Sequence, residues 1–79
     1  MMTLEVEYFN NTEIDYLKFY DVLAANGRVP TDTRVDGDKV TFVYNNLGPL
    51  PSRPKLENMF RKAGLEFKAL KVSGGLNSH

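Results

Sequence analysis

Residues 40–45 (VTFVYN) decide the fold, because five of the six side chains are β-branched or aromatic. Such residues favour strands over helices. Asp36-Gly37 lies just before this run and is typical of a tight hairpin turn, so residues 28–35 are predicted to form the partner strand. Pro30 cannot donate a hydrogen bond to a strand ladder, and we therefore expect this partner strand at an edge of the sheet.

Two registers are open to the predicted hairpin. A two-residue loop sets Arg34 opposite Lys39, which places two like charges together. A four-residue loop over residues 36–39 instead pairs Val35 with Val40 and keeps one face of the hairpin apolar. We expect the second register.

The N-terminal part of the chain predicts a strand followed by a helix. Residues 3–9 (TLEVEYF) alternate between apolar and acidic or polar side chains, which indicates a half-buried strand. Thr12 and Asp15 resemble a helix-capping pair, and Asn26-Gly27 is a helix stop. The apolar stripe of this helix comprises Tyr16, Phe19, Tyr20 and Leu23.

The C-terminal part repeats this order as a helix and then a strand. Ser52 is the expected N-cap of the second helix, and Gly64 its end. Its apolar residues are Leu56, Met59, Phe60 and Ala63, which share one helix face. A last strand is predicted from residue 65 to about residue 72. Its alternation slips at Ala69-Leu70, which indicates either a β-bulge or a short strand.

The predicted element order is strand, helix, strand, strand, helix, strand. This order is typical of an α+β domain of the two-layer βαββαβ kind, the ferredoxin-like split βαβ arrangement. We expect a four-stranded antiparallel sheet with spatial order 4-1-3-2 and two helices on one face. The sequence predicts a single domain over residues 1–72 and a flexible C-terminal tail over residues 73–79.

The formal net charge of zero conceals two oppositely charged halves. Residues 1–38 carry eight acidic and three basic side chains, whereas residues 39–79 carry seven basic and two acidic ones. With the last strand beside the first, Lys68 and Lys71 are expected to pair with Glu5 and Glu7. Much of the charge is then neutralised within the fold.

Composition argues against an enzyme. The chain has no cysteine, and its one histidine is the terminal residue, so serine has no internal imidazole base and thiolate or Cys-based zinc chemistry is excluded. No cofactor or metal site is predicted, and the two acids around Gly37 suit a hairpin turn better than a calcium loop. With neither an apolar run of membrane-spanning length nor a signal peptide, we expect a cytoplasmic protein with no membrane partner.

Nucleic-acid binding is the alternative function. The topology resembles that of the RNA-recognition motif, which implies base stacking on the two central strands. However, residues 39–44 lack that motif's glycine and its basic–aromatic spacing, and Glu5 and Glu7 would repel phosphate. A basic second helix is the other route to nucleic acid, through Arg53, Lys55, Arg61 and Lys62.

Binding to another protein is the favoured function. The proline-rich segment 46–54 is stiff and carries Leu47, Leu50 and Pro51. These leucines could equally pack beneath the sheet edge as a satellite core. The open sheet face is a second candidate surface, with Phe9 and Val43 at an apolar centre that could also join two copies in a homodimer.

The sequence thus favours a small non-enzymatic protein-binding or regulatory domain, inhibitor-like or adaptor-like. A short chain of this kind is also typical of phage accessory proteins and other products of mobile elements. The partner's identity is not encoded in any motif.

Overall fold

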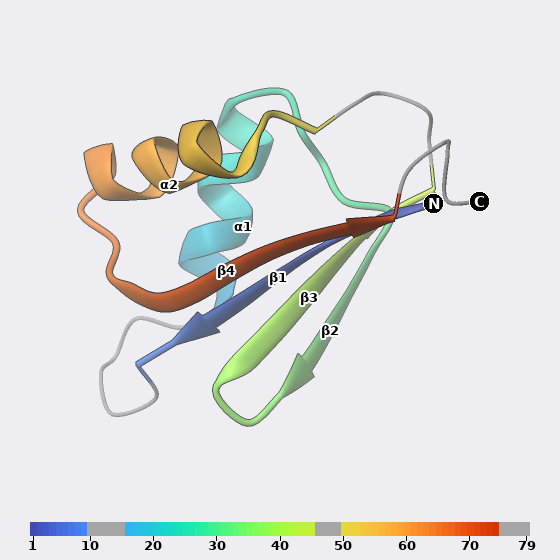
Figure 1. The fold of residues 1–79 in the computed structure, drawn as a ribbon, viewed down its shortest axis with the longest axis horizontal. Helices are drawn as coiled ribbons and strands as arrows, with labels where there is room; N and C mark the ends of the chain where they lie inside the picture. The colour runs from blue at the N-terminus through green and yellow to red at the C-terminus, as the bar shows by residue number, and fades with distance from the viewer. Residues whose placement is uncertain (10–15, 46–49, 75–79) are drawn as a thin grey trace.

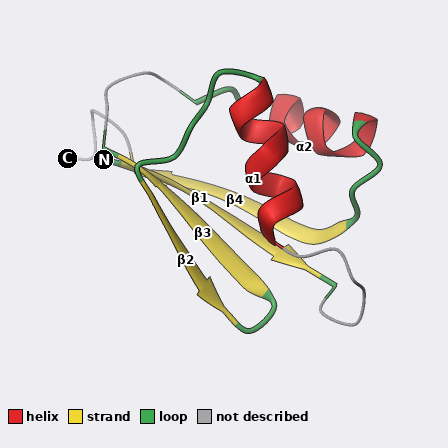
Figure 2. Ribbon diagram, turned by 180° about the vertical axis from the view of Figure 1, so that it is seen from behind, coloured by secondary structure: helices red, strands yellow, loops and turns green. Residues whose placement is uncertain are grey.

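The computed structural model describes residues 1–9, 16–45 and 50–74. They form a small α+β fold in which a four-stranded antiparallel sheet carries two helices. Both helices lie on one side of the sheet, and the opposite face is open (Figures 1 and 2). The elements follow in the order β1 (Met2–Tyr8), α1 (Tyr16–Ala25), β2 (Asp32–Asp36), β3 (Lys39–Tyr44), α2 (Arg53–Lys62) and β4 (Phe67–Gly74).

The strand order across the sheet is β2-β3-β1-β4, so β1 and β3 are central. β1 pairs antiparallel with both neighbours, with Leu4 opposite Phe42 and Val72. The predicted edge position of β2 is confirmed, but this strand begins at Asp32 rather than Arg28. Pro30 lies before the strand and is buried.

The β2–β3 hairpin has the expected register, with Val35 opposite Val40. The predicted four-residue loop is wrong, because Asp36 and Lys39 also pair and the turn itself consists of Gly37 and Asp38 only. Gly37 has a φ of 64°, and no non-glycine residue in the described part of the chain has a positive φ. A positive φ at the first turn position alone is the pattern of a type II′ turn, in which glycine is favoured there.

The predicted slip in β4 is confirmed as a bulge. Tyr8 of β1 pairs with Phe67, whereas the preceding Glu7 pairs with Ala69, so Lys68 is the extra residue. Because of this extra residue, Phe67 and Leu70 both turn toward the core although they are three positions apart. β4 runs to Gly74, so Ser73 and Gly74 belong to the sheet rather than to the predicted tail.

The core lies between the sheet and the two helices. The alternating strand residues supply one side of it and one stripe of each helix supplies the other. The largest fully buried side chains are Leu4, Val6, Phe19, Leu23, Val40, Phe42, Leu56 and Phe60. Phe19 of α1 and Phe60 of α2 meet edge to face, with ring centroids 5.1 Å apart, and this contact sets the two helices against each other.

Both helices end at glycine, as predicted. Gly27 and Gly64 have φ angles of 76° and 81°, and the next residue in each case returns a hydrogen bond to the helix. Arg28 N–H donates to the Leu23 carbonyl and Leu65 N–H to the Phe60 carbonyl. These bonds satisfy carbonyls that the helix end would otherwise leave unpaired. The predicted start of α1 at Thr12 and Asp15 lies outside the described residues.

Candidate protein-binding groove

Two adjoining depressions lie along α2 and the end of α1. The first has a volume of about 300 Å³ and is lined by Pro51, Lys55, Asn58, Met59 and Lys62. The second has a volume of about 340 Å³ and is lined by Val22, Ala25, Asn26, Met59, Lys62 and Ala63. Because Met59 and Lys62 belong to both, the depressions form one surface, which we call the α1–α2 groove.

One wall of this groove is formed by a stripe of residues on α2. Lys55, Met59 and Lys62 follow one another at i, i+4 and i+7 and therefore share a stripe of the helix. Met59 is partly buried against the core and lies between the two lysines along the helix, so it supplies an apolar part of the groove lining. A flexible and polarisable methionine can adapt to differently shaped apolar partners.

The two lysines of the groove hold their charges in solvent. Both are exposed, and within residues 1–9, 16–45 and 50–74 neither forms an ion pair with a carboxylate. The two arginines of the same helix behave differently. Arg53 Nε lies 3.8 Å and Arg61 Nη1 3.6 Å from the carboxylate of Glu57.

The basic set predicted from the sequence is therefore divided. Arg53 and Arg61 both form ion pairs with Glu57. The Arg61 guanidinium also lies over the Phe67 ring, 5.2 Å from its centroid. Lys55 and Lys62 lie instead beside Pro51, a residue assigned from the sequence to protein recognition. The structure thus joins residues from two separate hypotheses in one groove.

The first turn of α2 is unfavourably charged for a helix. It carries Arg53 and Lys55 and no acidic residue, and the N-cap Ser52 makes no side-chain capping hydrogen bond. Cations at the positive end of the helix macrodipole cost about 0.3–1 kcal/mol each. The pair of Arg53 with Glu57 at i, i+4 offsets this cost for Arg53. Lys55 forms no such pair among the described residues, so helix stability does not explain Lys55 at this end.

The other described residues that were predicted to bind a protein lie outside the α1–α2 groove. Leu47 lies outside the described residues, and Leu50 is half-buried against the core, as in the satellite-core alternative. Val43 does lie on the open face, but only 5% of it is exposed, so it offers little surface to a partner. Phe9 follows the end of β1 and is 37% exposed, with the Lys68 ammonium 5.6 Å from its ring centroid.

The open sheet face does not have the expected apolar centre. The strand register shows that charged residues cross it in rows, with Lys71, Glu5 and Arg34 in one row. The row beside it contains Glu7, Lys39 and Asp36. Because strand residues alternate between faces, most apolar members of these strands point to the helices, whereas Val43 stays on the open face.

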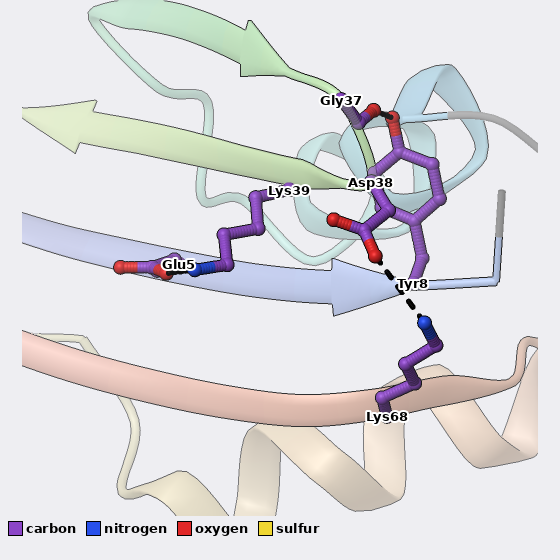
Figure 3. Close-up of polar contacts among 6 residues, drawn as sticks. All are labelled: Glu5, Tyr8, Gly37, Asp38, Lys39 and Lys68. Carbon is purple, nitrogen blue, oxygen red and sulfur yellow. Dashed lines mark hydrogen bonds and ion pairs between the residues drawn. The ribbon is translucent and has the colours of Figure 1, made fainter.

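The charges at the turn end of the sheet pair differently from the prediction (Figure 3). Lys39 Nζ, not that of Lys68 or Lys71, lies 3.8 Å from a Glu5 oxygen. Lys68 Nζ lies 3.2 Å from Asp38 Oδ2. The bulge explains this partner, because it moves Lys68 out of the regular alternation of β4 and toward the hairpin turn.

Tyr8 ties the same turn to the central strand. Its backbone N–H donates to the Asp38 carbonyl at 2.8 Å, and its hydroxyl donates to the Gly37 carbonyl at 3.3 Å. The hydrogen-bond donors of Tyr8 are thus paired with carbonyl groups of the turn, so we assign the cluster in Figure 3 a structural role. Among the described residues no group of three or more His, Cys, Asp or Glu side chains is placed to hold a metal ion.

Comparisons with known proteins identify no relative of this chain. The chain matches no protein-family model, no curated protein and no solved structure. In the described residues, neither helix has the length and apolar character needed to cross a membrane.

The sequence pattern contained part of the signal for the groove. Met59 was assigned to the buried stripe of α2, but it lies at the margin of that stripe, next to Lys55 and Lys62. Val22, Ala25 and Asn26 were not predicted, because their place in the groove depends on how α1 docks against α2.

Proposed function

We propose that this chain is a small non-enzymatic protein-binding domain of the ferredoxin-like class. In this proposal the α1–α2 groove receives an acidic, amphipathic segment of a partner protein. The observation that carries the proposal is the partly buried Met59 between Lys55 and Lys62, two exposed lysines that form no ion pair in the described structure.

The shape and chemistry of the groove favour a peptide over a small metabolite. It is open to solvent along its length, whereas small-molecule sites enclose most of the ligand surface. An amphipathic helix can place one apolar side chain on Met59 and acidic side chains beside the lysines, in the helix-in-groove mode. Binding without catalysis fits an inhibitor or adaptor role.

Nucleic acid is the less favoured ligand of the same helix. Glu57 engages both arginines, so two of the four predicted phosphate contacts would have to break existing ion pairs. The carboxylate of Glu57 would also lie near the bound phosphates and repel them. The apolar side chain of Met59 contributes nothing to phosphate binding.

The proposal is tested with an acidic amphipathic helical peptide of about 15 residues. Backbone amide shifts of the labelled full chain are followed by NMR during titration with this peptide and with a scrambled peptide of identical composition. We expect the ordered peptide to shift the residues that line the groove, and the scrambled peptide to shift them far less.

Charge variants separate specific from general attraction. Lys55→Glu/Lys62→Glu is expected to weaken binding at least about tenfold, a change of about 1.4 kcal/mol. Arg34→Glu/Lys71→Glu, at two exposed positions on the open face of the sheet, is the matched control with the same change of charge and is expected to retain binding. Peptide shifts spread over the sheet, or equal losses in both variants, would contradict the proposal. Salt-dependent binding of single-stranded oligonucleotides in place of the peptide would favour the nucleic-acid alternative.

A further inference from the structure

The two edges of the sheet differ in how they resist pairing with another strand. β4 carries the bulge at Lys68 and a second lysine, Lys71, two features that protect an exposed edge. β2 pairs with β3 without interruption from Asp32 to Asp36 and contains neither lysine nor proline. β2 is therefore the edge that remains open to another strand.

The hairpin geometry shows which backbone groups of β2 face outward. The pair that closes a two-residue hairpin, here Asp36 and Lys39, exchanges backbone hydrogen bonds, and bonded and non-bonded pairs then alternate. Thr33 and Val35 are thus the residues whose N–H and C=O groups point away from β3. Thr33 N–H is already held by the Asp32 carboxylate at 2.8 Å, which leaves Val35 as the open position.

Side chains at this edge are self-complementary about Val35. Arg34 and Asp36 flank it with opposite charges on the open face of the sheet. Val35 itself points to the helix side, yet it is 49% exposed because the helices do not cover this edge. β2 lies apart from both helices in Figures 1 and 2.

We propose that a second copy of this chain adds to the β2 edge, antiparallel and with the two-fold axis at Val35. The two Val35 residues then exchange backbone hydrogen bonds and bring their side chains into contact. Arg34 of each copy lies opposite Asp36 of the other, giving two cross-strand ion pairs beside the exposed pair that Arg34 forms with its own Asp32 at 3.6 Å. The result is one continuous sheet shared by both copies, with an isologous interface.

Other arrangements of two copies fit the observations less well. An axis at Arg34 sets the two arginines opposite each other and Asp32 opposite Asp36. An axis at Thr33 requires the Asp32 carboxylate to leave the Thr33 N–H. Packing through the open faces instead would bury rows of charged residues.

The strand contact is short, so the dimer is expected to be weak. Interfaces of less than about 1,200 Å² are typical of transient association. Sedimentation of the full chain is therefore measured up to about 1 mM, a range set by the affinity scale of weak complexes. We expect a monomer–dimer equilibrium that shifts toward dimer with concentration.

Val35→Pro is the first test variant. It removes the outward N–H of an edge residue and leaves the bonded pairs of β2 with β3 in place, so a folded monomer is expected. Circular dichroism checks that the fold is retained. A dimer that persists in folded Val35→Pro would overturn the proposal, as would a wild-type chain that remains monomeric at about 1 mM.

Charge variants test the register without relying on proline. Asp36→Arg is expected to weaken the dimer at least about tenfold, because it faces Arg34 of the other copy. The swap Arg34→Asp/Asp36→Arg restores opposite charges and is expected to restore the dimer. Asp21→Arg, an exposed position on α1 with the same change of charge, is the matched control and is expected to leave the dimer intact. Equal weakening by Asp21→Arg and Asp36→Arg would overturn the two-fold axis at Val35.

Discussion

The ammonium group of Lys68 lies 3.2 Å from the Asp38 carboxylate, and this contact joins β4 to the β2–β3 turn across the end of β1. The two residues are 30 positions apart in the sequence. They meet because the bulge in β4 re-aims Lys68 and because Tyr8 holds the turn through the Asp38 carbonyl.

The Lys68–Asp38 pair is expected to contribute modestly to stability. Its side chains are 41% and 33% exposed, and partly exposed ion pairs contribute up to about 1 kcal/mol. A double-mutant cycle with Lys68→Ala and Asp38→Ala, measured by urea unfolding, is expected to give a coupling energy of about 0.5 kcal/mol. High salt should reduce this coupling. The more exposed Arg34–Asp32 pair is the control, and a coupling above about 2 kcal/mol for Lys68–Asp38 would contradict the prediction.

Gly37 is expected to be sensitive to substitution because of its backbone conformation rather than its surroundings. A Cβ at this position would meet nothing within 4 Å, but φ is 64°. Gly37→Ala should therefore lower the free energy of unfolding by about 1–2 kcal/mol. Gly37→Asn should cost less, because asparagine tolerates positive φ better than alanine. Equal losses for both variants in chemical denaturation would show that backbone strain is not the cause.

Phe60 is expected to be the most costly residue of α2 to truncate. Its side chain is fully buried and contacts the rings of Phe19 and Phe67 edge to face. Phe60→Ala should lower the free energy of unfolding by about 3–5 kcal/mol, a large share of the 5–15 kcal/mol typical of a domain. The 37% exposed Phe9 provides the control, with an expected loss below about 1 kcal/mol for Phe9→Ala. Thermal unfolding of both variants separates these outcomes.

Tyr44 is expected to make stability fall at high pH. Burial raises the pKa of Tyr44 from its ordinary value of 10.0 to about 12, and the nearby Arg28 partly offsets this effect. The buried hydroxyl also donates to the Arg28 carbonyl at 2.8 Å. Because the folded state favours the neutral phenol, the associated stability is fully present below pH 10 and is lost as the pH rises from 10 to about 12.

This pH dependence can be measured by urea unfolding between pH 8 and pH 12, with tyrosine ionisation followed by absorbance. Tyr44→Phe should flatten the loss of stability above pH 10. It should also lower stability at neutral pH by about 0.5–1.5 kcal/mol, because the Arg28 carbonyl loses its donor. An unchanged alkaline slope in Tyr44→Phe would assign the effect to another group.

Local patterns were sufficient for the elements and for the hairpin register. Val35 had to oppose Val40 because a shift by one residue would turn the apolar face of the hairpin to solvent. The glycines at positions 27 and 64 marked the helix ends for an equally local reason, since they adopt positive φ without steric cost. The bulge in β4 was also visible, because the slip in alternation lies within one strand.

The surfaces required the tertiary structure. The sequence pattern assigns Val43 to a sheet face but does not show that this residue is buried there. It also places Lys68 near Glu5, whereas the folded chain brings Lys68 to Asp38. The α1–α2 groove depends in the same way on how two helices dock through Phe19 and Phe60.

Periodicity therefore determines strands, helices and the side of each that is buried, because these depend on neighbours a few positions away. Which lysine finds a carboxylate and which remains in solvent depends on distances between elements far apart in the chain. Those distances are set only when the core forms. In the described structure Arg53, Arg61 and Lys68 lie within ion-pair distance of a carboxylate, whereas Lys55 and Lys62 do not.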